Sequence, residues 1–485
     1  MKDKTADNSS TSSSSKINSP DFRGFLSLLE GQGQLARVRK DVGTKFELAA
    51  VTSKLDGKEA VVFSKVRNSK FAVAANVCGT PERFYLAISG GNPAKVDQNH
   101  NNNNNNIKTA IHSRITEALG RLSAPRISEA PASFEKNSSA SLADLPVVTH
   151  FEKDAGPFIT SSIVYTKDQE KGNQNSSTHR LLLLDDRHMA IRMVEGRHLH
   201  KCYSHARDHG EDLKVAITIG VHPAVSIAAA YQAAYGVDEM QIASSLLGYS
   251  GLTVSRAPGS GLYVPSHAEI VIEGRILRDR TQEEWMVEML RTYDHRRKQP
   301  VFELDRIRYR DNAVYHDVLP GYAEHRLLMG LPVEAKILDY VKNVVPTTKS
   351  VHLSDGGCNW LAAVIQIKKR LEGEPKNAIF AAFAAHPSLK TATVVDDDID
   401  PTDATAVEYA VITRCQADRG FVIVPNVKGS SLDPSSDQTN LLTTKLGIDA
   451  TATLQKPKER FEIAIIPGQG EIDLRDYLEI RKEIK

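Results

Sequence analysis

The spacing of hydrophobic positions divides the chain into three regions, and the first of them mixes short helices with short strands. Segments of helical period, such as DFRGFLSLLEGQG and PERFYLAIS, alternate with the apolar runs AVVFSKV and FAVAANV. Asp21 and Pro81 stand where a helix begins. TKFELAAVTSKL predicts a further helix, opened by a capping box of Thr44 and Glu47. Residues 21–128 therefore predict an N-terminal α+β domain.

In the second region the period shortens to two, which is typical of strands. RLLLLDDRHMAIRM predicts a hairpin around Asp185 and Asp186, and EIVIEGRI alternates apolar with polar residues. Two apolar helical segments interrupt this pattern, one after Pro223 and one in EMQIASSLLG. We therefore expect residues 129–318 to form a β-barrel-like domain with a helical insertion.

The third region, residues 319–485, alternates helices with buried strands. EAKILDYVKNV, KNAIFAAFAA and ATAVEYAVITR have helical period, whereas LAAVIQIK, TATVV and FVIVPNV are apolar strands. This alternation predicts an α/β layer, so the whole chain is expected to be of mixed α/β class. The terminal DLRDYLEIRKEIK is amphipathic and could dock on a second subunit or cover its own.

Composition narrows the class of protein. The 485 residues are 41% hydrophobic and 25% charged, which is ordinary for a soluble protein of two or three domains. Lys and Arg number 61 against 60 Asp and Glu, so charge gives no argument for a nucleic acid or membrane partner. Scattered cysteines, a Ser-rich stretch at 1–20 that predicts a disordered tail, and no long apolar window favour a cytoplasmic protein. The Asn-rich run at 99–106 predicts a loop insertion.

Three residues in the second region offer the ligands that a divalent cation uses. Asn175 lies in NSSTHRLLLL, His198 in EGRHLH, and Glu239 closes GVDE. An amide oxygen, an imidazole nitrogen and a carboxylate together suit a cation that prefers oxygen ligands. Each residue alone reads equally well as an ordinary surface or core position, so the residues by themselves leave the metal site open.

A second group of residues could handle protons. Arg180 follows Asn175 by five residues, and Glu283 and Glu288 flank the run EEWMVE. An arginine beside two glutamates can hold one ionised while the other exchanges a proton. The local pattern also allows a helix over TQEEWMVEMLRTY, opened by Thr281, in which Glu284 and Glu288 would share a face. Either Glu283 or Glu284 can therefore be the second acid, and an exposed helix with no catalytic role stays open.

These spacings, together with GLYVPSHAEIVIEG (261–274), KTATVVDDDID (390–400) and TTKLGIDAT (443–451), resemble the UbiD family of prenylated-FMN-dependent (de)carboxylases. The resemblance covers residues 21–485 and is closest to members that act on aromatic or heteroaromatic acids. It implies an N-terminal α+β domain, a split β-barrel that binds the flavin, and a C-terminal α/β domain that supports a homodimer. The segment 281–292 departs from the family, because it lacks the Pro and Gly of the family's catalytic loop.

The resemblance also implies roles for individual residues. The metal site would bind Mn²⁺ or Mg²⁺ beside the flavin phosphate, with K⁺ on nearby carbonyls. The implied metal ligands are Asn175, His198 and Glu239, the implied K⁺ carbonyls lie around Ala228, Ala229 and Tyr231, and the implied cofactor-binding residues are the three metal ligands with Arg180 and Lys445. The implied catalytic residues are Arg180, Glu283 and Glu288, and the implied substrate-binding residues are Arg197, Met289 and His325, with Arg326 beside the last of them. His325 and Arg326 read equally well as solvated charges that begin a helix.

The implied reaction is the reversible, non-oxidative decarboxylation of a small aromatic or heteroaromatic carboxylic acid through a covalent adduct with prenylated FMN. Such an enzyme depends on a flavin prenyltransferase for its cofactor. Cinnamate-type unsaturated acids are the alternative substrate class. Two other classes of function remain open, an oxidoreductase that uses ordinary FMN and a catalytically idle flavin-binding homologue.

Overall fold

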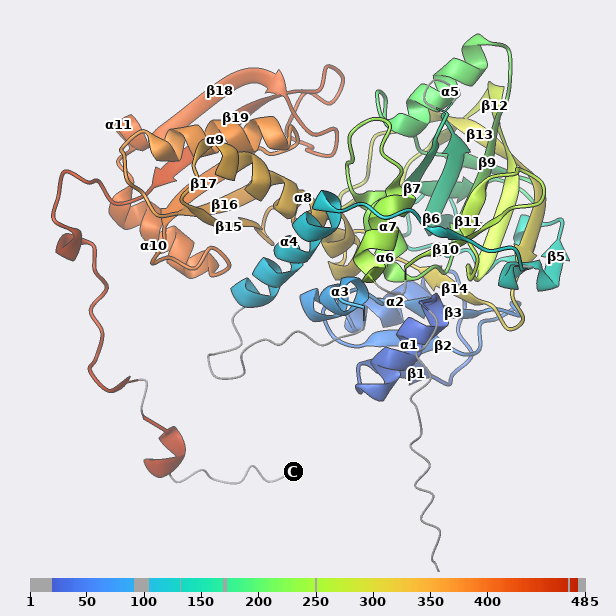
Figure 1. The fold of residues 1–485 in the computed structure, drawn as a ribbon, viewed down its shortest axis with the longest axis horizontal. Coiled ribbons are helices and arrows are strands. Elements are labelled where there is room, and N and C mark those ends of the chain that lie inside the picture. The colour runs from blue at the N-terminus through green and yellow to red at the C-terminus, as the bar shows by residue number, and fades with distance from the viewer. Residues whose placement is uncertain are drawn as a thin grey trace, which may run out of the picture.

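A computed structural model describes residues 20–90, 104–130, 132–168, 172–248, 251–469 and 472–478. The three regions expected from the sequence occupy different parts of the molecule (Figure 1). The blue N-terminal elements lie below a barrel drawn in green and yellow, and the orange C-terminal elements lie beside it. The Ser-rich stretch and most of the terminal amphipathic segment fall outside the described residues.

The N-terminal region is a small sheet covered by helices. Asp21 caps the first helix by accepting a hydrogen bond from the Gly24 amide at 2.7 Å, and Thr80 caps the helix that begins at Pro81. The predicted Thr44–Glu47 capping box is wrong, because the chain enters that helix through Phe46 at a φ of 67°. The elements are α1 (Phe22–Gly31), α2 (Glu47–Lys54), α3 (Pro81–Ile88), β1 (Leu35–Val38), β2 (Ala60–Phe63), β3 (Ala72–Ala75) and, returning from the barrel, β14 (Val314–Asp317), with sheet order β1-β2-β3-β14.

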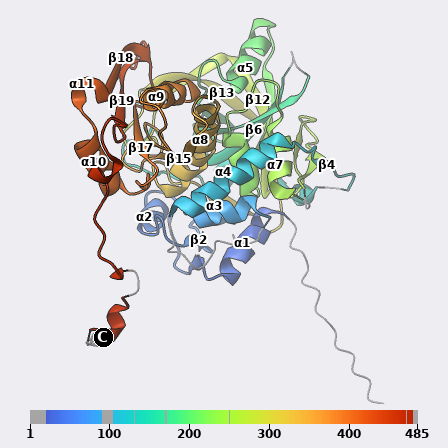
Figure 2. The same cartoon turned by 60° about the vertical axis from the view of Figure 1, so that its left-hand side comes forward.

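The end of the Asn-rich run is helical, which corrects the expected loop. Residues 99–103 lie outside the described residues, but α4 (Asn104–Gly120) already begins within the run. Apolar residues at helical spacing, from Ile107 to Ala118, are buried. Their burial stabilises a helix that already begins among the asparagines, at Asn104. Figure 2 shows α4 running beside α8 (Ala323–Val344), with which it packs. Tertiary burial has overridden the low-complexity signal here.

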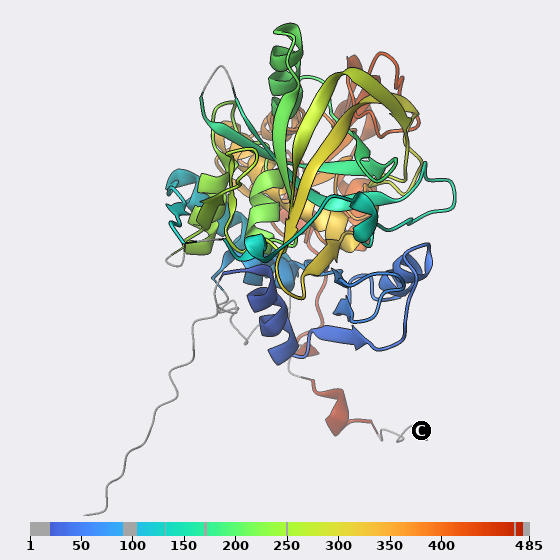
Figure 3. The same ribbon diagram turned by 90° about the vertical axis from the view of Figure 1, so that its right-hand side faces the viewer.

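Six antiparallel strands close into the predicted barrel (Figure 3). The order β12-β9-β6-β7-β8-β13 is closed by pairing of β12 with β13, and β5 (Asn137–Ser139) extends it. The hairpin around Asp185 is confirmed, since its carboxylate accepts hydrogen bonds from the amides of Arg187 and His188. The strands are β6 (Phe158–Lys167), β7 (Gln174–Leu183), β8 (His188–Ile191), β9 (Leu213–Ile219), β12 (Ile270–Glu284) and β13 (Arg297–Tyr309).

The helical insertion is also confirmed, whereas the helix considered over 281–293 is wrong. Strand β12 continues to Glu284, which stands opposite Arg297 of β13, and a loop follows. Cross-strand pairing supplies backbone partners that outweigh the local capping pattern. The inserted elements are α5 (His198–Asp208), α6 (Pro223–Ala230), α7 (Glu239–Leu247) and a small sheet of β4 (Arg126–Ile127), β10 (Thr253–Arg256) and β11 (Tyr263–Pro265).

The C-terminal region is a five-stranded sheet packed with helices. Its central strands β16, β17 and β19 are parallel, as expected for an α/β layer, and both edge strands are antiparallel. Besides α8, the elements are β15 (Thr348–Leu353), β16 (Ala362–Ile367), α9 (Glu374–Ala385), β17 (Thr391–Asp396), α10 (Ala404–Arg414), α11 (Ala417–Gly420), β18 (Phe421–Lys428) and β19 (Leu442–Ala450). Single 3₁₀ turns occur at Ser133–Lys136, Leu142–Asp144, Lys458–Arg460 and Leu474–Asp476.

A buried carboxylate joins the regions. Glu334 of α8 accepts hydrogen bonds from Lys108 of α4 at 3.1 Å and from the Leu353 amide of β15 at 2.7 Å. Its other oxygen lies 3.1 Å from the imidazole of His112. Burial opposes ionisation, but Lys108 and the histidines outweigh it and hold the pKa of Glu334 well below its usual range. Among the described helices, none is both long and apolar enough to cross a membrane.

Candidate active site

Arg180 is the centre of a buried ion-pair array. It projects from β7, and its side chain is 9% exposed. Its Nε and Nη2 donate to the two oxygens of Glu284 at 3.0 and 2.8 Å, while Nη2 also donates to Asp294 at 2.9 Å. Its Nη1 donates to Glu288. One guanidinium thus holds three carboxylates together, an arrangement that can serve a proton-handling site.

The end of β12 decides which glutamate meets the arginine. Successive side chains of a strand point to opposite faces. Glu284 is fully buried against Arg180, and Glu283 is exposed and lies opposite Lys298 of β13. Of the two acids that the sequence left open, the structure therefore brings Glu284 to Arg180 and leaves Glu283 in solvent.

Glu288 is held by a tight turn after β12. Its backbone amide donates to the Thr292 carbonyl at 3.0 Å, and Arg291 completes the turn at a φ of 60°. Gly321, at a φ of 76°, packs against this turn so closely that an added Cβ would lie 2.9 Å from the Glu288 carbonyl oxygen. The glycine is therefore required for the approach of the two loops, and it fixes where the Glu288 side chain begins.

Asp294 is a site residue that the sequence analysis missed. It is buried in the loop between β12 and β13, near the start of β13. It accepts hydrogen bonds from Arg180 and Arg297 and lies 3.9 Å from the Arg192 Nε. No periodic signal marks it, since it falls in an irregular segment. Its position six residues after Glu288, near the basic pair Arg296 and Arg297, is the only local hint in the sequence.

The charged groups of the array shift one another's pKa values. Burial alone would lower the pKa of Arg180, but Glu284 and Asp294 raise it above its usual value. Burial likewise opposes ionisation of Asp294, yet Arg180 and Arg297 hold its pKa below the usual range. Burial, followed by repulsion from Arg180, lowers the pKa of Arg192 to about 10. Arg180 and Asp294 are thus fixed in their charged forms.

Asn175, His198 and Glu239 also come together, from β7, α5 and α7. The Asn175 amide donates to Glu239 at 3.1 Å, and the His198 Nδ1 lies 3.5 Å from that amide and 3.7 Å from the Glu239 carboxylate. Glu239 is 2% exposed and Asn175 5%. A rotated amide would present its oxygen in place of its nitrogen, which gives an O, N, O donor set. This set fits a divalent cation that binds oxygen and imidazole ligands.

The other predicted residues lie on several elements. Next to Arg180, His325 of α8 accepts a hydrogen bond from the Gly321 amide at 3.1 Å, and burial and Arg180 lower its pKa to about 4. Met289 is 2% exposed and packs into the core shared with α8. Arg197 precedes α5, and Lys445 of β19 is buried. The Ala228, Ala229 and Tyr231 carbonyls lie at the C-terminal end of α6, where those of Ala228 and Tyr231 accept hydrogen bonds from the amides of Tyr231 and Ala233 at 3.2 and 3.0 Å.

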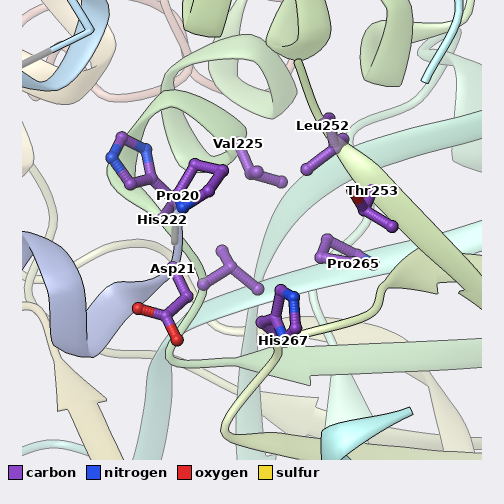
Figure 4. Close-up of a pocket in the computed structure, with 9 residues that line it drawn as sticks. Pro20, Asp21, His222, Val225, Leu252, Thr253, Pro265 and His267 are labelled. Atoms are coloured by element: carbon purple, nitrogen blue, oxygen red, sulfur yellow. The ribbon is translucent and has the colours of Figure 1, made fainter. Parts of the chain in front are cut away.

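A small hollow elsewhere in the molecule is unrelated to this site. Figure 4 shows it where the chain enters α1, lined by Asp21, His222 and His267. Asp21 already has hydrogen-bonding partners, since it caps α1 and pairs with Arg310 at 2.9 Å. The described residues contain no group of three or more His, Cys, Asp or Glu side chains placed to hold a metal, so this hollow offers none.

Comparison with known proteins identifies the family. Three family models match in succession, namely the N-terminal, Rift-related and C-terminal domains of 3-octaprenyl-4-hydroxybenzoate carboxy-lyase, at residues 26–98, 126–323 and 326–450. An anhydromevalonate phosphate decarboxylase from Methanocaldococcus jannaschii is 49% identical over 324 residues, which cover 67% of this chain and 76% of the relative. The chain belongs to the UbiD family. It is therefore a carboxy-lyase, and the resemblance noted in the sequence is confirmed.

Further UbiD relatives match over nearly the whole chain. An anhydromevalonate phosphate decarboxylase from Methanothermobacter thermautotrophicus is 39% identical over 445 residues, covering 91% of this chain and 99% of the relative. The UbiD-class enzyme HmfF from Pelotomaculum thermopropionicum, solved in complex with FMN, has a TM-score of 0.87 and 38% identity and covers 94% of this chain and 100% of its own. The predicted fold class, with its barrel, is that of the UbiD-class structures.

Proposed function

We propose that the protein catalyses reversible, non-oxidative decarboxylation with prenylated FMN bound beside the barrel. The observation that carries this proposal is the array in which Arg180 holds Glu284, Glu288 and Asp294. A UbiD-family barrel that lacked such an array would be a candidate for an idle homologue. Here the acids are retained, although the loop that bears Glu288 lacks the family's Pro and Gly.

The chain's own residues fit the cofactor and its metal. Asn175, His198 and Glu239 would hold Mn²⁺ or Mg²⁺ beside the flavin phosphate, and a dication there neutralises the phosphate charge. The buried Lys445 would add a further positive charge, and the carbonyls at the end of α6 would bind K⁺. When bound, prenylated FMN supplies the electron sink for the electrons released as carbon dioxide leaves.

The array divides proton handling between its acids. Arg180 pairs with Glu284 and Asp294, whose side chains are both about 1% exposed, and it holds the pKa of Asp294 below its usual range. The Glu288 side chain is 17% exposed, so it can exchange protons with solvent. Glu288 would therefore donate the proton that replaces carbon dioxide on the substrate carbon. Arg180 would keep Glu288 in reach of that carbon by holding it through Nη1.

Anhydromevalonate phosphate is the proposed substrate. Two relatives with 49% and 39% identity are named for its decarboxylation. This substrate is not aromatic, so the aromatic class expected from the sequence stays a prediction. The test is turnover of anhydromevalonate phosphate by protein co-expressed with a flavin prenyltransferase. Carbon dioxide release by that protein, with none from protein reconstituted with FMN alone, is the expected result.

A small aromatic or heteroaromatic acid is the second candidate. It is favoured by His325, whose ring lies close enough to Arg180 for the two to interact electrostatically. A neutral imidazole there can hydrogen-bond a ring hydroxyl or ring heteroatom. Hydroxybenzoate, furoate, pyrrole carboxylate and cinnamate assayed beside anhydromevalonate phosphate separate the classes. Turnover with ordinary FMN would instead favour an oxidoreductase, and no turnover of any acid would favour an idle homologue.

We also propose a homodimer formed through the C-terminal region. Large apolar side chains of that region are exposed, Tyr409 and Ile412 on α10 and Phe421 and Ile423 on β18. Ile412 is 74% exposed. Exposed apolar side chains that share a helix face, as Tyr409 and Ile412 do at i and i+3 on α10, favour an interface. Light scattering of the full chain, compared with that of Ile412→Lys, tests this assembly.

A further inference from the structure

The turn that carries Glu288 has no proline or glycine to fix its shape, since residues 285–292 read WMVEMLRT. It closes through Arg291, whose backbone amide donates to the Glu288 carbonyl at 2.8 Å. Arg291 does so at a φ of 60°, a backbone conformation that residues with a Cβ rarely adopt without support from their surroundings. The position of Glu288 therefore depends on the contacts that hold Arg291.

The Arg291 side chain leaves the turn and lies on the segment that leads into α8. Its Nε donates to the Gly321 carbonyl at 3.0 Å, and its guanidinium lies over the Tyr322 ring, 4.0 Å from the ring centroid. Its Nη2 donates to Asp56 at 3.5 Å. The Arg291 side chain is 47% exposed, so this ion pair by itself contributes little to stability. Its significance depends on what else the Asp56 carboxylate binds.

Asp56 also binds the start of α8. Its second oxygen accepts a hydrogen bond from the Ala323 amide at 2.7 Å, and its carboxylate lies 4.0 Å from the Arg326 Nη2 in the first turn of the helix. Ala323 is the first residue of α8, where amides lack partners within the helix, and the N-cap residue Tyr322 supplies no side-chain hydrogen bond. One carboxylate therefore caps α8 and pairs with Arg291, which packs on the residue just before Ala323.

The base from which Asp56 projects is itself fixed. Asp56 lies in the turn after α2, where the neighbouring Leu55 carbonyl accepts hydrogen bonds from the Asn76 side chain at 2.6 Å and from the Lys58 amide at 2.9 Å. Asn76 follows β3 and is 3% exposed. Asp56 thus joins the N-terminal sheet to α8 and to the Glu288 turn of the barrel region.

We propose that Asp56 is a positioning residue for Glu288 and acts through Arg291. Neither Asp56 nor Arg291 has to touch the reacting atoms, because together they fix the turn from which the Glu288 side chain begins. The proposal rests on the proposed function, in which Glu288 donates a proton and a displacement of about 1 Å lowers the rate. Asp56→Asn keeps an oxygen for the Ala323 amide but loses the charge that faces Arg291, whereas Asp56→Ala loses both.

Amide hydrogen exchange tests the turn without relying on turnover. It is followed by mass spectrometry on FMN-loaded full-length protein, at the Glu288 and Arg291 amides, both of which are hydrogen-bonded within the turn. We expect Asp56→Ala to speed their exchange about tenfold or more, and Asp56→Asn to speed it by a smaller factor. Asp41→Asn is the control, because Asp41 is a carboxylate of the same region whose ion pair, at 3.8 Å, is with Arg67.

The control decides what a change in exchange means. Asp41→Asn should exchange at the turn as the wild type does. Unchanged exchange in Asp56→Asn, or an equal rise in Asp41→Asn, overturns the proposal, because the charge that faces Arg291 would then not hold the turn.

Kinetics show whether the turn acts through Glu288. With prenylated FMN bound and anhydromevalonate phosphate as substrate, we expect Asp56→Asn to lower kcat about fivefold or more and to leave KM and flavin content nearly unchanged. In a Glu288→Gln background the same substitution should change the residual kcat by less than about twofold, because the group that it displaces is already gone. Equal loss in both backgrounds would show a general effect on the fold and overturn the proposal. If exchange changes as expected but no acid is turned over, the proposed function fails and Asp56 stands as the residue that holds the turn.

Discussion

Arg180 and Glu284 face each other across the barrel through two parallel hydrogen bonds of 3.0 and 2.8 Å, an arrangement that only a guanidinium can make with a carboxylate. The two residues are 104 positions apart in the chain. Their pairing places one charge of each sign on facing strands and leaves the remaining guanidinium donors for Glu288 and Asp294. The predictions below concern this array, the metal ligands and the loop beside them.

Glu284 and Glu283 provide a matched pair of variants. We expect Glu284→Gln to lower kcat by about two orders of magnitude, because the amide cannot accept both guanidinium donors. Glu283→Gln changes the same group one residue away on the exposed face and should keep kcat within about twofold. Steady-state rates on the protein loaded with prenylated FMN decide this. Loss of activity in Glu283→Gln with an active Glu284→Gln would reverse the assignment.

Glu288→Gln separates chemistry from cofactor binding. It keeps the size of the side chain but cannot donate a carboxyl proton, so we expect kcat to fall by roughly two orders of magnitude or more. Flavin and metal content should stay at the wild-type level, since Glu288 is not one of the candidate metal ligands Asn175, His198 and Glu239. Both quantities can be measured on one preparation. A nearly active Glu288→Gln enzyme would remove Glu288 as the proton donor.

His198→Ala should lower metal and flavin content together. It removes one of three ligands, and loss of the cation also removes the positive charge that would face the flavin phosphate. His200→Ala is the control, because His200 lies two residues further along α5 and is not one of the candidate metal ligands. Elemental analysis and flavin absorbance of both variants give the result. Full metal occupancy in His198→Ala would show that His198 is not a ligand.

Asp294→Asn tests the missed residue through the pH dependence of stability. Arg180 and Arg297 lower the folded pKa of Asp294, so its ionisation stabilises the fold above the unfolded pKa of about 3.9. That contribution is lost as pH falls through the lower, folded pKa. We expect Asp294→Asn to be less stable than wild type by about 3 kcal/mol at neutral pH. The difference should shrink in acid, and urea unfolding at several pH values would show whether it does.

Gly321→Ala tests whether the turn positions Glu288. The added Cβ would meet the Glu288 carbonyl at 2.9 Å, so the turn must move. We expect a fall in kcat of about tenfold or more with flavin retained. Gly33→Ala is the control, since Gly33 also has a positive φ, of 69°, but nothing lies within 4 Å of its added Cβ. Its cost should be confined to stability, at about 1 kcal/mol. An equal loss of kcat in Gly33→Ala would argue against a role for the turn.

The periods of the hydrophobic pattern determined most of the fold by themselves. Alternation in EIVIEGRI predicted β12, the Asp185 hairpin predicted the β7–β8 connection, and the helix and strand alternation after residue 319 predicted the C-terminal α/β layer. These signals are reliable because each element buries one face, and burial imposes its period on the sequence. The resemblance to the UbiD family, rather than any period, singled out Asn175, His198 and Glu239, which the structure brings together.

The tertiary structure alone decided which acids surround Arg180. Around Glu284 the local pattern allowed a helix, because a capping pattern is a local signal and carries no information about the partner strand β13. Once β12 pairs to its end, the two-residue period turns Glu284 inward and Glu283 outward. Asp294 has no period at all. Its place is defined by where the loop after β12 meets Arg180 of β7, and that meeting follows from closure of the barrel.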